Sequence, residues 1–145
     1  MSQKLEVTVE IQSSADKFYD FFKNHMNDLV NVFPATFKSV QLIEGEEGSV
    51  GSVKLWNYVL GGISMTAKVK VEAINDVERS ITFAVVDGDL LQLYLSYNTT
   101  LTASDGIVKW SIEYEKALEI VPIPDLYVTL SVAVSKAVDL YLLTH

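Results

Sequence analysis

An alternation of apolar and polar residues with period two runs from Phe37 to Lys116, and it restricts the possible folds more than any other feature. Such alternation is typical of strands with one buried face. Turn signals interrupt it at 45–51, Gly61-Gly62, Asn75-Asp76, Asp87-Gly88 and Asp105-Gly106. Because Gly-Gly and Asp-Gly between alternating runs indicate hairpins, the pattern predicts about six consecutive antiparallel strands.

A further strand and two short helices are predicted before this region. Residues 4–12 alternate strictly and form a half-buried strand. Ser13 and Asp16 have the spacing of a capping box, which predicts a helix start, and the phenylalanines that follow share one helical face. A second short helix is predicted over Met26 to Val32, ending before Pro34.

One long helix is predicted after Pro124, with Asp125 near its N-terminus. A stripe at helical spacing should face the sheet: Tyr127, Leu130, Ser131, Val134 and Val138. The segment from Ile123 onward is also apolar enough to be a candidate membrane span. Lys136 and Asp139 interrupt it, however, and charges at a bilayer centre cost several kcal/mol. We therefore expect the helix of a soluble protein and no membrane insertion.

These elements predict a single α+β domain over residues 1–145, in which a curved antiparallel sheet wraps around a helix. The chain has no cysteine, which excludes disulfides and cysteine-based zinc sites. Its two histidines, His25 and His145, are too few for a histidine-rich metal site. We expect no metal and no cofactor.

The formal charge of −8 restricts the class of partner. No basic stripe is present that could neutralise phosphates, so nucleic acid is not expected as a partner, and an acidic membrane surface is disfavoured. The expected partner is an apolar small molecule, and the sequence defines no protein partner. The alternating N-terminus argues against a secretory signal, and a cytoplasmic location is expected.

The stretch GEEGSVGSVKLW places Gly45, Gly48 and Gly51 three residues apart, which suggests a phosphate-binding loop. Such a loop leads from a strand into a helix, whose amides bind the anion. Here the glycines join two predicted strands, and Glu46 and Glu47 lie between them. The stretch is therefore interpreted as a hairpin connection and not as a nucleotide site.

Several amphipathic aromatic residues fall on the predicted inner faces. The alternation points these side chains inward: Trp56, Tyr58, Phe83, Leu95, Tyr97, Trp110 and Tyr114. A bulge could shift the parity of the strand that contains Leu95 and Tyr97. Buried Trp and Tyr need hydrogen-bond partners, so their convergence favours a pocket with orienting polar groups. For each residue taken singly, ordinary core packing is the preferred interpretation, and the alternation alone does not predict a hollow interior.

Four basic residues leave alternatives open. Lys54 shares the face of Trp56, where it would either lose its proton more easily, pair with a carboxylate, or extend its ammonium group to solvent. Lys68 and Lys70 alternate with apolar residues and therefore lie on the opposite face of their strand. That face borders either a cavity or solvent, and solvent is the preferred interpretation. His25 is interpreted as an exposed or capping residue, with a role at a cavity mouth as the alternative.

Four segments carry a resemblance to a known family: KLEVTVEIQSSADKFYDFF, the glycine loop running into VKLWNY, GIVKWSIEYEK and AVDLYLLTH. Together they resemble the major latex protein-like family, a branch of the plant class-10 pathogenesis-related and birch-pollen-allergen superfamily. The resemblance implies a helix-grip fold, with a seven-stranded antiparallel sheet around a long C-terminal helix. Two short helices form a V beneath it, and a large hydrophobic cavity lies inside.

The resemblance also implies binding of a hydrophobic plant metabolite, such as a terpenoid, steroid or hormone, in the cytosol. The alternative is an isomerase or cyclase of specialised metabolism without metal or organic cofactor, with Lys54, Tyr58 and Tyr114 as catalytic candidates; a receptor-like module ranks last. The chain departs from its relatives because no lysine follows Gly88-Asp89 in that strand, which favours apolar ligands. The residues expected to bind the ligand are Phe22, His25, Lys54, Trp56, Tyr58, Phe83, Leu95, Tyr97, Trp110, Tyr114, Tyr127, Leu130, Ser131 and Val134.

Overall fold

The structure, a computed structural model, describes residues 2–145. Strand β1 (Gln3–Glu10) is followed by helix α1 (Ala15–Asn24), a 3₁₀ turn η1 (Met26–Asp28) and the short helix α2 (Leu29–Val32). The remaining elements are β2 (Phe37–Glu44), β3 (Val53–Leu60), β4 (Ile63–Asn75), β5 (Ser80–Gly88), η2 (Asp89–Gln92), β6 (Tyr94–Ser104), β7 (Ile107–Lys116) and α3 (Asp125–Thr144). The predicted order of elements is confirmed.

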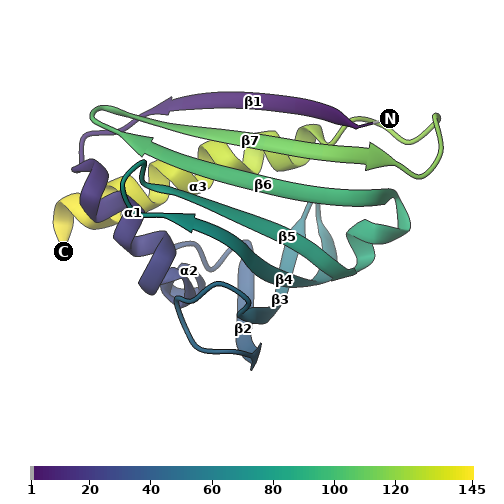
Figure 1. The fold of residues 1–145 in the computed structure, drawn as a ribbon, viewed down its shortest axis with the longest axis horizontal. Coiled ribbons are helices and arrows are strands. Elements are labelled where there is room, and N and C mark those ends of the chain that lie inside the picture. Colours follow the sequence, from purple (N-terminus) through teal and green to yellow (C-terminus); the bar gives the residue numbers. More distant parts are fainter. Residues whose placement is uncertain (1) are drawn as a thin grey trace.

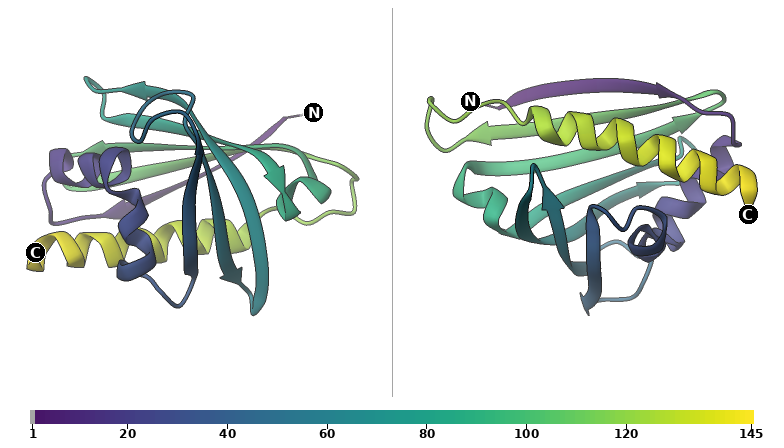
Figure 2. Two further views of the ribbon diagram at one scale, coloured as in Figure 1. Left: turned by 90° about the horizontal axis from the view of Figure 1, so that it is seen from below. Right: turned by 180° about the vertical axis from the view of Figure 1, so that it is seen from behind.

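The seven strands form one antiparallel sheet in the order β1-β7-β6-β5-β4-β3-β2. Consecutive strands from β2 to β7 are neighbours, and β1 joins the far edge beside β7. The sheet is strongly curved, and α3 lies across its concave face, with α1 and α2 at the end where the chain terminates (Figures 1 and 2). This is the predicted α+β arrangement of a curved sheet, a long C-terminal helix and two short helices.

The start of α1 differs from the prediction. Its N-cap is Ser14, whose hydroxyl accepts a hydrogen bond from the Lys17 amide at 3.1 Å, so the predicted capping role of Ser13 is wrong. Ser13 instead donates to Asp139 of α3, through its amide at 2.8 Å and its hydroxyl at 2.6 Å. Either of the two adjacent serines could serve as the N-cap of α1. Ser14 does so because Ser13 is bonded to Asp139.

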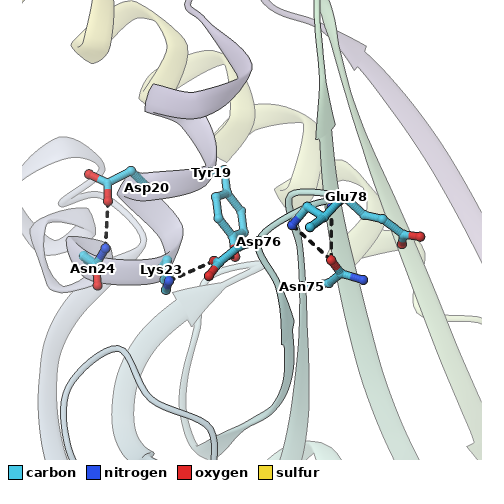
Figure 3. Close-up of polar contacts among 8 residues, drawn as sticks. Tyr19, Asp20, Lys23, Asn24, Asn75, Asp76 and Glu78 are labelled. Atoms are coloured by element: carbon cyan, nitrogen blue, oxygen red, sulfur yellow. Dashed lines mark hydrogen bonds and ion pairs between the residues drawn. The ribbon is translucent and has the colours of Figure 1, made fainter.

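A network of polar contacts joins α1 to the β4–β5 turn. Figure 3 shows Tyr19 and Lys23 of α1 both directed at Asp76, with hydrogen bonds of 2.5 Å and 2.8 Å. Asn75 shapes the turn by accepting hydrogen bonds from the amides of Val77 and Glu78. The hydrogen bond from Lys23, followed by that from Tyr19, lowers the pKa of Asp76. The contacts hold α1 over the end of the sheet.

Helix α3 is apolar on more than its inner face. Val134 and Val138 are buried against the sheet, as predicted, whereas Leu126, Leu140 and Leu143 are exposed on the outer side. By length and composition alone α3 could cross a membrane, a test that helices packed on a sheet can also meet. Contacts with β1, β7, α1 and α2 define it here as the helix that covers the concave face of the sheet.

A bulge in β6 changes the predicted orientation of one residue. The pairing with β7 shifts between Tyr94 and Ser96, so Tyr94 and Tyr97 are both buried although three positions separate them. Leu95 lies within the bulge and is 66% exposed. The prediction that Leu95 points inward is therefore wrong, because an extra residue in one strand reverses the alternation of faces.

Candidate ligand-binding cavity

A cavity lies between the concave face of the sheet and α3, with about 150 Å³ available to the centres of water-sized spheres. None of its eighteen lining residues carries a charge. They come from α1, η1 and α2 at one end, from the sheet, from η2 and from α3: Phe22, Met26, Leu29, Phe37, Trp56, Tyr58, Ala67, Val69, Phe83, Val85, Leu90, Tyr97, Thr99, Trp110, Tyr127, Leu130, Ser131 and Val134. Ten of the fourteen residues expected at the site therefore line this space.

The alternation of side chains between the two faces of each strand explains which residues of the sheet line the cavity. Trp56 and Tyr58 lie on one face of β3, and their neighbours Ala67 and Val69 in β4 pair with this strand and face the same side. Trp110 of β7 contacts Phe22 of α1 edge to face, with ring centroids 5.4 Å apart. The aromatic residues therefore form much of the wall, as the alternation predicts.

The indole of Trp110 is fixed by a residue that the sequence analysis did not single out. Its Nε1–H donates to Ser135 Oγ at 2.7 Å, and Ser135 in turn donates to the Ser131 carbonyl oxygen at 2.7 Å. Ser135 is fully buried. Its position four residues after Ser131 was the available signal, because residues four apart share a helical face.

Two tyrosine hydroxyls meet between sheet and helix. The oxygen atoms of Tyr58 and Tyr127 are 2.5 Å apart, and the Tyr127 hydroxyl also donates to Met65 Sδ at 3.8 Å. Burial raises the pKa of Tyr58. Burial, followed by the neighbouring Tyr58, also raises the pKa of Tyr127. Both phenols therefore remain protonated at neutral pH.

Lys54 is buried but lies outside the main cavity. Its side chain is 10% exposed, and its ammonium group contacts Glu47 Oε2 at 2.5 Å and Asn27 Oδ1 at 2.7 Å. It therefore pairs with a carboxylate, one of the predicted alternatives, and the partner comes from the glycine loop. Lys54 and Glu47 border a smaller space of about 20 Å³ that shares Phe22 and Trp56, among others, with the main cavity.

The glycine loop connects β2 to β3, as predicted, and contains no phosphate-binding geometry. Gly45 has a φ of +74°, and a Cβ there would lie 2.9 Å from the Ser52 Cα. Glycine is therefore required by the turn itself.

Three other expected site residues do not line the cavity. His25 is exposed, with its Nε2 3.3 Å from Asp20 Oδ2, and it also forms the C-cap of α1 through its backbone. Tyr114 is buried in a second cluster, of which Leu90 and Tyr97 line the cavity and Tyr114 does not, and Leu95 faces solvent. The structure therefore gives no cavity position to His25, Tyr114 or Leu95.

The two lysines of β4 face away from the interior. Lys68 is half-exposed, with its ammonium group 3.7 Å from Asp87 Oδ2, and Lys70 is exposed. Both therefore lie on the solvent side, the preferred alternative. Within residues 2–145, no group of three or more His, Cys, Asp or Glu side chains could hold a metal ion.

Comparison with known proteins agrees with this fold. The chain matches the Pathogenesis-related protein Bet v 1 family over residues 1–145. It is 37% identical to MLP-like protein 34 of Arabidopsis thaliana over 99% of the chain, and spans about half (48%) of that relative's length. It is 40% identical to major latex protein 146 of Papaver somniferum, over 83% of the chain and 79% of the relative.

A solved structure of a related protein has the same fold. Major latex-like protein 151 from Panax ginseng superimposes with a TM-score of 0.94 and 34% identity, over 97% of both chains. A seven-stranded sheet closed by a long C-terminal helix, with two short helices at one end, defines a helix-grip protein. The chain belongs to the Bet v 1 family, and its relatives include the major latex proteins.

Proposed function

We propose that the protein binds a compact, uncharged and mostly apolar small molecule between the sheet and α3. The observation that carries this proposal is the uncharged, largely aromatic lining of the cavity. Ligand sites are typically concave, apolar and equipped with a few polar groups. A charged ligand would lose its hydration without gaining a partner of opposite charge.

The size of the cavity narrows the class of ligand. An apolar cavity of about 150 Å³ in another protein admits benzene, whereas drug-sized ligands occupy about 300 Å³ or more. The space of about 150 Å³ described here therefore favours a compact terpenoid over a steroid. A plant metabolite belongs to the same proposal, because the matched relatives come from plants. A cytoplasmic location is proposed from the alternating N-terminal segment, which does not have the pattern of a secretory signal.

Tryptophan fluorescence provides a direct test, since Trp56 and Trp110 are the two tryptophans of the chain and both line the cavity. Titration with uncharged terpenoids should change their emission in a saturable manner. Val134→Phe fills the cavity and should weaken binding by roughly tenfold or more, because the added ring occupies the space of the ligand. Thr129→Phe, on the exposed side of α3, is the matched control and should bind normally.

The result that would overturn the proposal is specific. If no terpenoid in a panel of hydrocarbons, alcohols and ketones changes the emission or gives heat in calorimetry, the cavity does not serve this class of ligand. Binding that is equally strong in Val134→Phe and Thr129→Phe would place the ligand elsewhere on the protein.

A second candidate function is an isomerase or cyclase that encloses a reactive intermediate, and the Tyr58–Tyr127 hydroxyl pair favours it. A phenol in a water-excluding site can stabilise a developing oxyanion. We expect Tyr58→Phe to alter the product ratio when a candidate reactive intermediate is incubated with the protein. Product ratios that match the protein-free reaction would dismiss this candidate.

A further inference from the structure

The hydroxyl groups in the cavity differ in how far their hydrogen bonds are already satisfied. Both tyrosine protons are used when the Tyr58 hydroxyl donates to Tyr127 and the Tyr127 hydroxyl donates to Met65 Sδ. Ser131 donates to the Tyr127 carbonyl oxygen at 2.8 Å. The Trp110 N–H is held by a serine of α3. None of these donors is free to bind a ligand without breaking an existing bond.

Tyr97 is different. Within residues 2–145 its hydroxyl has no hydrogen-bond partner, although the residue is only 4% exposed and lines the cavity. No fully enclosed polar side-chain atom of the described chain lacks a partner, so the Tyr97 oxygen keeps some accessible surface in a residue that lines the cavity. An unused donor in such a position points to a group that the ligand supplies.

The surroundings of Tyr97 fix the orientation of its ring. The ring centroid lies 5.4 Å from that of Tyr127 on α3 and 6.0 Å from that of Tyr94 on the same strand. Burial, followed by the nearby Tyr58 and Tyr94, raises the pKa of Tyr97, so the phenol keeps its proton. Thr99, two residues further along β6, lines the same cavity and also has an unpaired hydroxyl within the described residues.

We propose that Tyr97 selects ligands with one uncharged oxygen acceptor, such as a ketone, aldehyde or ester carbonyl, by donating a hydrogen bond to it. The inference rests on the proposed function and adds the polar feature that the ligand must carry. The rest of the ligand contacts mostly apolar walls, because the other donors of the cavity, apart from the Thr99 hydroxyl two residues from Tyr97, are already used. The ligand class is therefore a compact oxygenated terpenoid, and not a pure hydrocarbon or a carboxylate.

Three probes that share one ring skeleton test this assignment: limonene, a hydrocarbon; carvone, its ketone; and perillic acid, a carboxylate. The wild-type protein should bind carvone about three- to tenfold more tightly than limonene, the range expected for one net hydrogen bond. Perillate should bind more weakly than either. In Tyr97→Phe the carvone preference should vanish, while the limonene affinity stays unchanged.

Tyr94→Phe is the matched control. Its hydroxyl donates to the Pro122 carbonyl oxygen at 2.7 Å and Tyr94 does not line the cavity, so this variant removes a buried phenol outside the site. It should keep the carvone preference. The carbonyl stretch of bound carvone provides a second readout, which should lie at lower frequency in the wild-type protein than in Tyr97→Phe.

The possible results separate the two proposals. If Tyr97→Phe keeps the wild-type ratio of carvone to limonene affinity, or the carbonyl frequency is the same in both proteins, the role of Tyr97 is refuted and the cavity still binds apolar ligands. If neither carvone nor limonene binds, the binding function itself fails for molecules of this size.

Discussion

The orientation of the Trp110 ring in the apolar cavity wall depends on one hydrogen bond, from its indole N–H to Ser135 Oγ. Its ring is buried, and its N–H has a single acceptor, Ser135 Oγ at 2.7 Å. A buried donor without a partner costs more than the hydrogen bond itself contributes. The serine therefore determines the orientation of a ring that forms part of the cavity wall.

Replacing Ser135 tests this point. We expect Ser135→Ala to lower the free energy of unfolding by about 1–3 kcal/mol, because the indole N–H of Trp110 is left unpaired. Ser131→Ala is the control: its hydroxyl only donates to a helix carbonyl, so the change should stay within about 0.5 kcal/mol. Urea denaturation followed by tryptophan emission measures both. Equal stability of the two variants would show that Ser135 has no such role.

At the scale of elements, most of the fold could be predicted from the sequence, because each strand and helix carries its own local pattern. The turn at Gly61-Gly62 and the long helix after Pro124 are examples. The errors arise where an element departs from regular geometry or where a distant partner intervenes. The bulge in β6 exposes Leu95. Ser13 does not form the predicted N-cap, because it donates hydrogen bonds to Asp139, which is distant in sequence. Neither effect leaves a periodic signal.

The candidate site was predicted less completely than the fold, and the reason concerns the whole molecule. Alternation identifies which side chains point inward, such as Trp56 and Tyr97, but it is the same whether the interior is packed or hollow. The expectation of a cavity came from the family resemblance. Tyr114 illustrates the limit: it is buried, as predicted, yet it packs into a second cluster and does not line the cavity.

Three carboxylates join segments that are distant in sequence, and they give the whole molecule a defined response to acid. Bonds from Ser111 and then Lys109 lower the pKa of Glu6, which connects β1 to β7. Asp76 connects the β4–β5 turn to α1. Partial burial alone would raise the pKa of Asp139, but hydrogen bonds from Ser13 and Gln12 outweigh it, so the pKa is lowered.

A lowered pKa in the folded state fixes the sign of the effect. The stabilisation from Glu6, Asp76 and Asp139 is complete above their ordinary pKa values of 4.5 and 3.8, and it is lost as the pH falls through the lower folded values. We expect the unfolding midpoint to change little between about pH 7 and 5 and to fall below about pH 4. Combining Glu6→Gln, Asp76→Asn and Asp139→Asn should destabilise the protein at neutral pH.

The distinguishing result is the difference between the wild-type protein and this triple variant as a function of pH. The difference in unfolding midpoint should be largest near neutral pH and should shrink as the pH falls, because protonation removes from the wild-type protein the same contacts that the substitutions remove. Glu72→Gln, Glu78→Gln and Glu119→Gln together alter three exposed carboxylates and control for the change in net charge. If this control shows the same pH-dependent difference, the acid response arises from net charge. The three connecting contacts would then not be its cause.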